Sequence, residues 1–291
     1  MTELLTHLES LRRSGRKLLV PYLMGGFPEA NSYPEALTAV AQHADAIEIG
    51  LPYSDPLMDG PVIASAGERV IRDGTGPNRA LDLSAEVEIH IPSIVMTYYN
   101  PIHRMGEANF CRRAVAAGFS GLIVPDLPLE ESGSLRSIAA DASLAWVGLV
   151  APTSPPDRIA ATAAASTGFV YAVSTLGVTG ERDALASSAQ RVVEACRAAT
   201  ELPLLLGIGV SNVEQARVAA AAADGVVIGS AVVRTVLERG AGPRAIFSPG
   251  SGRHWTPSRS DHDRVNVRVL AVLQVNRVKW PVCGLFCSLR W

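Results

Sequence analysis

A repeating pattern between residues 17 and 230 constrains the fold of this chain most. Each repeat has a short apolar run, a turn and an alanine-rich stretch with helical spacing. Uninterrupted apolar runs that alternate with helices are typical of parallel strands, because both faces of such strands are covered. The pattern predicts eight strands, at residues 18–24, 45–50, 92–98, 120–125, 144–150, 168–174, 202–209 and 224–230.

Eight strand-and-helix units favour an α/β fold of the (β/α)8 TIM-barrel class, with residues 1–239 forming a single domain. The alternative is an open doubly wound sheet, which usually has about five or six strands and a G-x-G-x-x-G motif after the first. The first apolar run is followed instead by MGGFP, with Gly25 and Gly26, and not by that motif. We therefore predict the barrel.

Composition excludes several classes of partner and site. Hydrophobic residues make up 48% and charged residues 19%, as in folded proteins. A net charge of −2 and 5% aromatic residues favour neither nucleic acid nor an anionic membrane as a partner. Residues 1–17 are predicted to form a short amphipathic helix rather than a signal peptide, and no apolar stretch has the length of a membrane span. Cys283 and Cys287 lack a second pair, so we expect no metal site and a reducing cytoplasm.

Residues 240–291 differ in composition from the rest. They hold eight basic but two acidic residues, with three of the four tryptophans and two of the four cysteines. Such a break predicts an irregular, poorly ordered tail of different origin. Our hypothesis is an altered reading frame or a recent fusion, and sequencing the transcript across codons 235–245 tests it, since an in-frame tail contradicts the frameshift version.

Glu48 lies inside the second apolar run, where alternation places it on the face opposite to Ile47 and Ile49. A carboxylate inside a barrel is unfavourable unless it is paired or used. Burial would raise its pKa, as acid–base work near neutral pH requires. A salt-bridged core glutamate is equally compatible with the pattern.

Asp55 and Asp59 follow in a loop rich in proline, serine and glycine. Aspartates in such loops commonly bond to nearby backbone groups, and Asp55 fits that interpretation well because a proline follows it. Local geometry favours a turn for Asp59 too. However, Asp59 stands where the loop would return over the mouth of the barrel, where catalytic groups of this fold lie.

The last two units end in glycines just before a helix, in GIGVS and IGSAVV. Exposed backbone N–H groups at a helix start bind anions, and barrels often bind phosphate after their last two strands. Simple tight turns are the alternative. The sixth unit ends in a long glycine-containing loop, which predicts a lid with Thr179 and Gly180 as gate residues.

Together these segments resemble the tryptophan synthase alpha chain family over about residues 2–237. IEIGLPYSDPLMDG is similar to that family's signature around two catalytic carboxylates. The match continues in order through MTYYNPI, GLIVPDLPLEE, LVAPTSPPDRI, GFVYAVSTLGVTG and GIGVS…DGVVIGSAVV. The resemblance implies retro-aldol cleavage of indole-3-glycerol phosphate to indole and glyceraldehyde 3-phosphate, in tryptophan biosynthesis.

The resemblance also implies roles for single residues. Glu48 would be the general acid–base, and Asp59 the carboxylate that accepts the indole N–H. The implied phosphate-binding residues are Gly180, Gly209, Gly229 and Ser230. The implied pocket residues are Tyr22, Met96, Ile123, Leu149, Tyr171, Thr179 and Ile208. Asn100 and Asp126 match positions that border the partner subunit and the active site.

A family member of this kind works in an α2β2 assembly with a beta subunit that carries pyridoxal phosphate, so we expect no cofactor on this chain. Two alternatives remain at this point. One is a stand-alone lyase. The other is a silent subunit, because the tail replaces the amphipathic helix that closes the family's barrel. Other phosphate-binding barrels, such as sugar-phosphate isomerases, are a more distant alternative.

Overall fold

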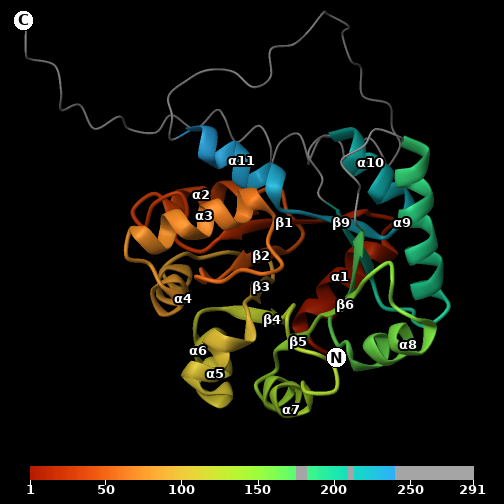
Figure 1. Ribbon diagram of the computed structural model, residues 1–291, viewed down its shortest axis with the longest axis horizontal. Helices are drawn as coiled ribbons and strands as arrows, with labels where there is room; N and C mark the ends of the chain where they lie inside the picture. The colour runs from red at the N-terminus through yellow and green to blue at the C-terminus, as the bar shows by residue number, and fades with distance from the viewer. Residues whose placement is uncertain (175–181, 209–212, 240–291) are drawn as a thin grey trace, which may run out of the picture.

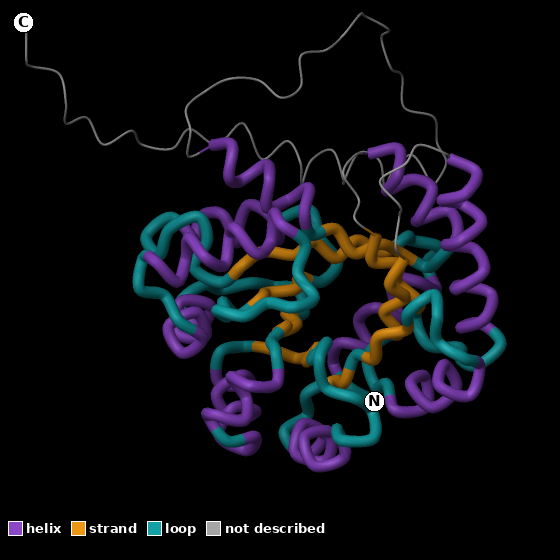
Figure 2. Tube along the Cα trace, in the orientation of Figure 1, coloured by secondary structure: helices purple, strands orange, loops and turns teal. Residues whose placement is uncertain are grey.

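The computed structural model describes residues 1–174, 182–208 and 213–239. In these residues the strands form a parallel sheet that curves into a ring, with helices around its outside (Figures 1 and 2). The order around the ring is β5-β4-β3-β2-β1-β9-β8-β7-β6. The strands are β1 (Leu18–Met24), β2 (Ile47–Gly50), β3 (Ser93–Met96), β4 (Phe119–Ile123), β5 (Ala145–Trp146), β6 (Gly148–Val150), β7 (Val170–Ser174), β8 (Leu204–Ile208) and β9 (Gly225–Ile228).

The predicted TIM barrel is confirmed, with one refinement in its fifth strand. The run at residues 144–150 forms two short strands, because β5 pairs with β4 while β6 pairs with β7. Val147 lies between them, and its backbone N–H still donates to the Leu122 carbonyl at 3.1 Å. The chain passes from one neighbour to the other at this residue, and the ring closes there.

Helices follow the strands and bury their apolar sides against them. They are α1 (Glu3–Arg13), α2 (Tyr33–Ala41), α3 (Pro61–Arg72), α4 (Pro77–Ala85), α5 (Tyr99–Met105), α6 (Glu107–Ala116), α7 (Gly133–Asp141), α8 (Pro156–Ala165), α9 (Arg182–Arg197), α10 (Val213–Ala222) and α11 (Ser230–Arg239). Three of them begin at a proline, at Pro61, Pro77 and Pro156. Proline suits a first helical position, since the N–H that it lacks would have no helical partner there.

The predicted amphipathic N-terminal helix is confirmed as α1, and it closes one end of the barrel. Leu4 and Leu8 are fully buried and belong to the same cluster as the residues that fill the barrel interior. Gly121 makes room for this helix, since a Cβ there would lie 2.8 Å from the Leu4 Cδ2 atom. The Thr2 hydroxyl donates to the Thr167 carbonyl, just before β7 begins. With the N-terminal end of the strands covered, chemistry is confined to their carboxyl ends.

No helix within the described ranges combines the length and the apolar character needed to cross a membrane. The predicted tail, residues 240–291, lies outside the described residues.

Candidate active site

Glu48 faces the interior of the barrel. Its neighbour Ala46 belongs to the interior cluster, whereas Ile47 and Ile49 pack in the cluster outside the sheet. The Glu48 side chain is only 3% exposed, and its Oε2 atom is buried without a hydrogen-bond partner. In the described part of the chain no cation forms an ion pair with it. The structure therefore does not support the alternative of a salt-bridged core glutamate.

The surroundings of Glu48 favour its neutral form. Burial raises its pKa, and the negative charge of nearby Asp59 raises it further, to about 8. A buried carboxylate whose Oε2 atom has no hydrogen-bond partner is poorly solvated as an anion, which accounts for the direction of the shift. At pH 7 Glu48 thus holds a proton that it can donate.

Asp59 lies in the loop between β2 and α3, close enough to Glu48 to influence its charge. Burial raises the pKa of Asp59, and a hydrogen bond from Tyr98 opposes that rise. The Tyr98 hydroxyl donates to the Asp59 Oδ1 atom at 3.0 Å. Of the two carboxylates, Asp59 therefore has the better stabilised anion.

Tyr98 was not among the predicted site residues, although Met96 and Asn100 of the same MTYYNPI stretch were. The signal was available, because Tyr98 stands two residues beyond the end of β3, where side chains of a parallel barrel reach the mouth.

Two tyrosines lie near Glu48, one on the adjacent strand β1 and one on β7, farther around the barrel. Tyr22 pairs with Glu48 in the register of β1 and β2. Tyr171 lies on β7. Burial raises its pKa most, and the negative charge of Glu48 raises it further. Burial also raises the pKa of Tyr22, with smaller contributions from Asp59 and Glu48. Both hydroxyls therefore stay protonated beside the carboxylates.

Each ring occupies space that a glycine leaves open. A Cβ on Gly50 would lie 2.0 Å from the Tyr22 hydroxyl oxygen, and one on Gly207 would lie 1.8 Å from Tyr171 Cε2. Both distances are far shorter than van der Waals contact. The glycines at these strand ends therefore decide where the two rings can lie.

We expect Gly207→Ala to lower both the stability of the fold and the catalytic activity of this site. The new methyl group must displace the Tyr171 ring or the backbone, and overpacking of this kind typically costs about 1–3 kcal/mol. Thermal unfolding and an assay of the product measure the two effects. Gly133→Ala is the control, because a Cβ at that position would meet no atom within 4 Å beyond its own chain neighbours and the local helix backbone. Native stability in Gly207→Ala contradicts this account of the site.

The remaining predicted pocket residues lie on neighbouring strands inside the barrel. Met96 pairs with Ile123, and Leu149 pairs with Tyr171. All four contribute to the apolar interior cluster. Ile208 ends β8 opposite Ser174, and its side chain is outside the described part of the structure. Apolar walls therefore surround the carboxylates on several sides.

Of the predicted phosphate-binding residues, Gly229 and Ser230 at the start of α11 lie within the described residues. The Gly229 carbonyl accepts the Val233 N–H at 3.1 Å, so α11 starts at Ser230 with its first N–H groups free of helical partners. A Cβ on Gly229 would lie 3.6 Å from the Tyr22 Cβ, which places this helix start beside the pocket. Thr179, Gly180 and Gly209 lie outside the described residues.

Asn100 and Asp126 lie at the rim of the mouth. They line a hollow of about 530 Å³ together with Tyr99, His103, Leu127, Pro128 and Glu131. The Asp126 Oδ1 atom accepts the Tyr99 N–H at 2.8 Å, and the Asn100 side chain donates to the Tyr53 hydroxyl at 3.0 Å. Leu57, in the adjoining β2–α3 loop, is 87% exposed. The rim thus carries polar and apolar groups close together.

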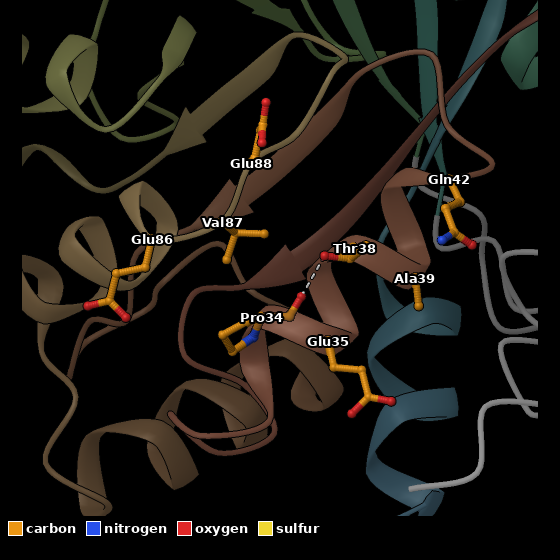
Figure 3. A pocket seen from close by; sticks show the side chains of 8 residues that line it. All are labelled: Pro34, Glu35, Thr38, Ala39, Gln42, Glu86, Val87 and Glu88. Atoms are coloured by element: carbon orange, nitrogen blue, oxygen red, sulfur yellow. Dashed lines mark hydrogen bonds between the residues drawn. The ribbon is translucent and has the colours of Figure 1, made fainter.

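A separate groove of about 520 Å³ lies outside the barrel, between α2 and residues 86–88. Figure 3 shows its carboxylates, Glu35, Glu86 and Glu88, together with Thr38, whose hydroxyl donates to the Pro34 carbonyl. None of the predicted site residues lines it. In the described ranges, no group of three or more His, Cys, Asp or Glu side chains could hold a metal ion.

Comparison with known proteins gives a consistent result. The family model described as tryptophan synthase alpha chain matches residues 8–248. The tryptophan synthase alpha chain of Synechococcus sp. (strain CC9902) is 43% identical over 238 residues, which are 80% of this chain and 88% of the relative. That of Gloeobacter violaceus is 47% identical over 219 residues, or 74% and 79% of the two chains.

Solved structures are similar over most of their length. A crystal structure of tryptophan synthase from M. tuberculosis has a TM-score of 0.76 and 33% identity, covering 96% of this chain and 99% of that one. Tryptophan synthase subunit alpha from Legionella pneumophila str. Paris has a TM-score of 0.77 and 26% identity, covering 94% and 98%.

Proposed function

Because this chain belongs to the tryptophan synthase alpha chain family, we propose that Glu48 and Asp59 carry that family's reaction at the mouth of the barrel. As a member of the family it is a lyase of tryptophan biosynthesis, which cleaves indole-3-glycerol phosphate to indole and glyceraldehyde 3-phosphate. The observation that supports the assignment most is the buried, unpaired Glu48 Oε2 atom, in a site where Asp59 supplies a second carboxylate.

In the proposed reaction, Glu48 starts protonated and gives its proton to C3 of the indole ring. The ring nitrogen then carries a positive charge. The Glu48 carboxylate next removes the proton from the hydroxyl on the carbon attached to C3, and the oxygen forms the aldehyde C=O. The bond between that carbon and C3 breaks, and its electron pair returns to the ring. Glu48 ends protonated, ready for another turnover, which agrees with its pKa of about 8.

Asp59 has the complementary role in the proposal. It accepts the indole N–H and stabilises the positive charge that develops on the ring nitrogen during the first step. An anion placed where charge develops lowers the barrier most when water is excluded. The hydrogen bond from Tyr98 favours the anionic form of Asp59 that this role needs.

We assign the rest of the substrate to the surrounding groups. The phosphate would bind at the start of α11 through Gly229 and Ser230, joined by Gly180 and Gly209. A helix start suits this group because its free N–H groups and its dipole attract anions. The indole ring would lie among Tyr22, Met96, Ile123, Leu149, Tyr171 and Ile208, with Thr179 on the lid.

The family works with a beta subunit. We propose that this chain joins it in an α2β2 assembly, in the cytoplasm, and that the rim with Asn100 and Asp126 faces the partner. Exposed apolar Leu57 on the same rim supports a docking role. Pyridoxal phosphate chemistry would belong to the beta subunit, since the cleavage needs proton transfer and charge stabilisation, which the two carboxylates supply.

The direct test is indole formation from indole-3-glycerol phosphate, measured for the purified chain with and without beta subunit. We expect release in both cases and a marked increase with the partner. Equal rates would indicate a stand-alone lyase and contradict the partner assignment. A folded chain that releases no indole under either condition would contradict the assignment of Glu48 and Asp59.

A further inference from the structure

Tyr98 joins the β2–α3 loop to the end of β3. Its hydroxyl donates to the Asp59 Oδ1 atom at 3.0 Å and accepts the Met58 backbone N–H at 2.9 Å. One oxygen atom thus holds both the catalytic carboxylate and the loop backbone beside it. Within the described ranges, no other hydrogen bond to the Asp59 carboxylate is present.

The Tyr98 ring is itself held in place. It is 3% exposed, and the ring of Tyr53 packs against it with centroids 5.3 Å apart. The Tyr53 hydroxyl in turn accepts the Asn100 side-chain N–H at 3.0 Å. Contacts from the loop and from α5 therefore fix the ring, so its hydroxyl has a defined position.

We propose that Tyr98 is a positioning residue for the cleavage, which holds the Asp59 carboxylate over the barrel mouth through Oδ1 and leaves Oδ2 to accept the indole N–H. The inference rests on the proposed role of Asp59. It assigns Tyr98 no contact with the reacting atoms.

The physical reason lies in the loop that carries Asp59. Residues 51–60 form no helix or strand, and Leu57 and Met58 beside Asp59 are 87% and 64% exposed. Tyr53 packs near the start of the loop, but little packing fixes the segment at Leu57 and Met58 next to the carboxylate. Misplacement of a reacting group by about 1 Å can slow a reaction by about a hundredfold. A bond from a rigid strand end removes that freedom before substrate binds.

The hydrogen bond also separates the two carboxylates electrostatically. A donor to an anion lowers its pKa, and the Tyr98 hydroxyl acts in this direction on Asp59. Glu48 has no such donor on Oε2. Removing the Tyr98 hydroxyl should therefore raise the pKa of Asp59.

Tyr98→Phe tests the proposal, because it keeps the ring and removes both hydrogen bonds. We expect kcat/KM for indole release to fall roughly ten- to a hundredfold, as for other bonds to charged groups. The fall should lie mainly in kcat, because the positive charge that Asp59 stabilises develops on the ring nitrogen only during the reaction. The acid limb of the pH profile should move to higher pH, because Asp59 then protonates more easily.

Tyr33→Phe is the matched control. It also removes a buried tyrosine hydroxyl, bonded to Ser84 at 2.9 Å in another part of the molecule. We expect it to lower stability and leave the pH profile unchanged. A structural effect alone would make the two variants behave alike, and that result would overturn the proposal.

A second comparison separates this inference from the assignment on which it rests. If Tyr98 acts through Asp59, Tyr98→Phe should have little further effect in the Asp59→Asn background. Full additivity of the two changes would overturn the role of Tyr98. If instead Asp59→Asn alone is as active as the native chain, the role of Asp59 fails first, and the inference fails with it.

Discussion

Glu48→Gln is expected to lower the rate of indole formation by roughly two to four powers of ten, which is the usual contribution of a general acid–base. Glutamine has nearly the same shape but can neither donate the proton to C3 nor remove one from the hydroxyl. Steady-state assays with beta subunit measure the loss. Glu88→Gln, on the exposed outer groove, is the control. Activity equal to the native chain would remove Glu48 from the mechanism.

The same variant should be more stable than the native chain at alkaline pH. The ordinary pKa of Glu48 is 4.5, and in the folded chain it is about 8. Its favourable contribution is complete below 4.5 and is lost as pH rises to about 8, because the unfolded state ionises more readily. Each unit of difference corresponds to about 1.4 kcal/mol.

Unfolding measured at pH 5 and at pH 8 checks this linkage. The stability advantage of Glu48→Gln should be large at pH 8 and small at pH 5. An advantage that does not change with pH would mean that Glu48 is not buried in its neutral form. The native enzyme should also lose kcat/KM as pH rises past about 8, since the first step needs protonated Glu48.

Asp59→Asn is expected to lower kcat by roughly a hundred- to a thousandfold, the range found when a group that stabilises developing charge is removed. The neutral amide keeps the size of the side chain and one acceptor oxygen but loses the negative charge, so KM should change less than kcat. Assays with beta subunit measure both constants. Asp73→Asn, at the exposed end of α3, is the control. A raised KM with an unchanged kcat would contradict the proposed role of Asp59 in stabilising the developing charge.

Much of the architecture could be predicted because its signals are local. The apolar runs predicted the barrel strands, and alternation within the second run predicted the inward direction of Glu48. Alternation has a period of two residues, so a single well-placed run decides the face of every side chain. The helix at Glu3–Arg13 was also predictable from a local signal, the amphipathic spacing of its leucines.

The site could not be completed this way because its parts come from segments far apart. Asp59 and Tyr98 are 39 residues apart, and their bond depends on how the β2–α3 loop returns over β3. Local geometry alone favoured a turn for Asp59, and its closeness to Glu48 became visible only in the fold. The break in the fifth strand at Val147 likewise depends on two different neighbours.

The sequence by itself therefore determined the barrel, the inward face of Glu48 and, through the resemblance, the family, which the comparisons confirm. The tertiary structure alone decided that Glu48 is unpaired, that Asp59 lies close to it and is held by Tyr98, and that Gly50 and Gly207 leave space for two tyrosine rings. The physical reason is that hydrophobic periodicity acts within one strand. The pairing of charges and the space for a ring depend on the register between strands, which the folded barrel sets.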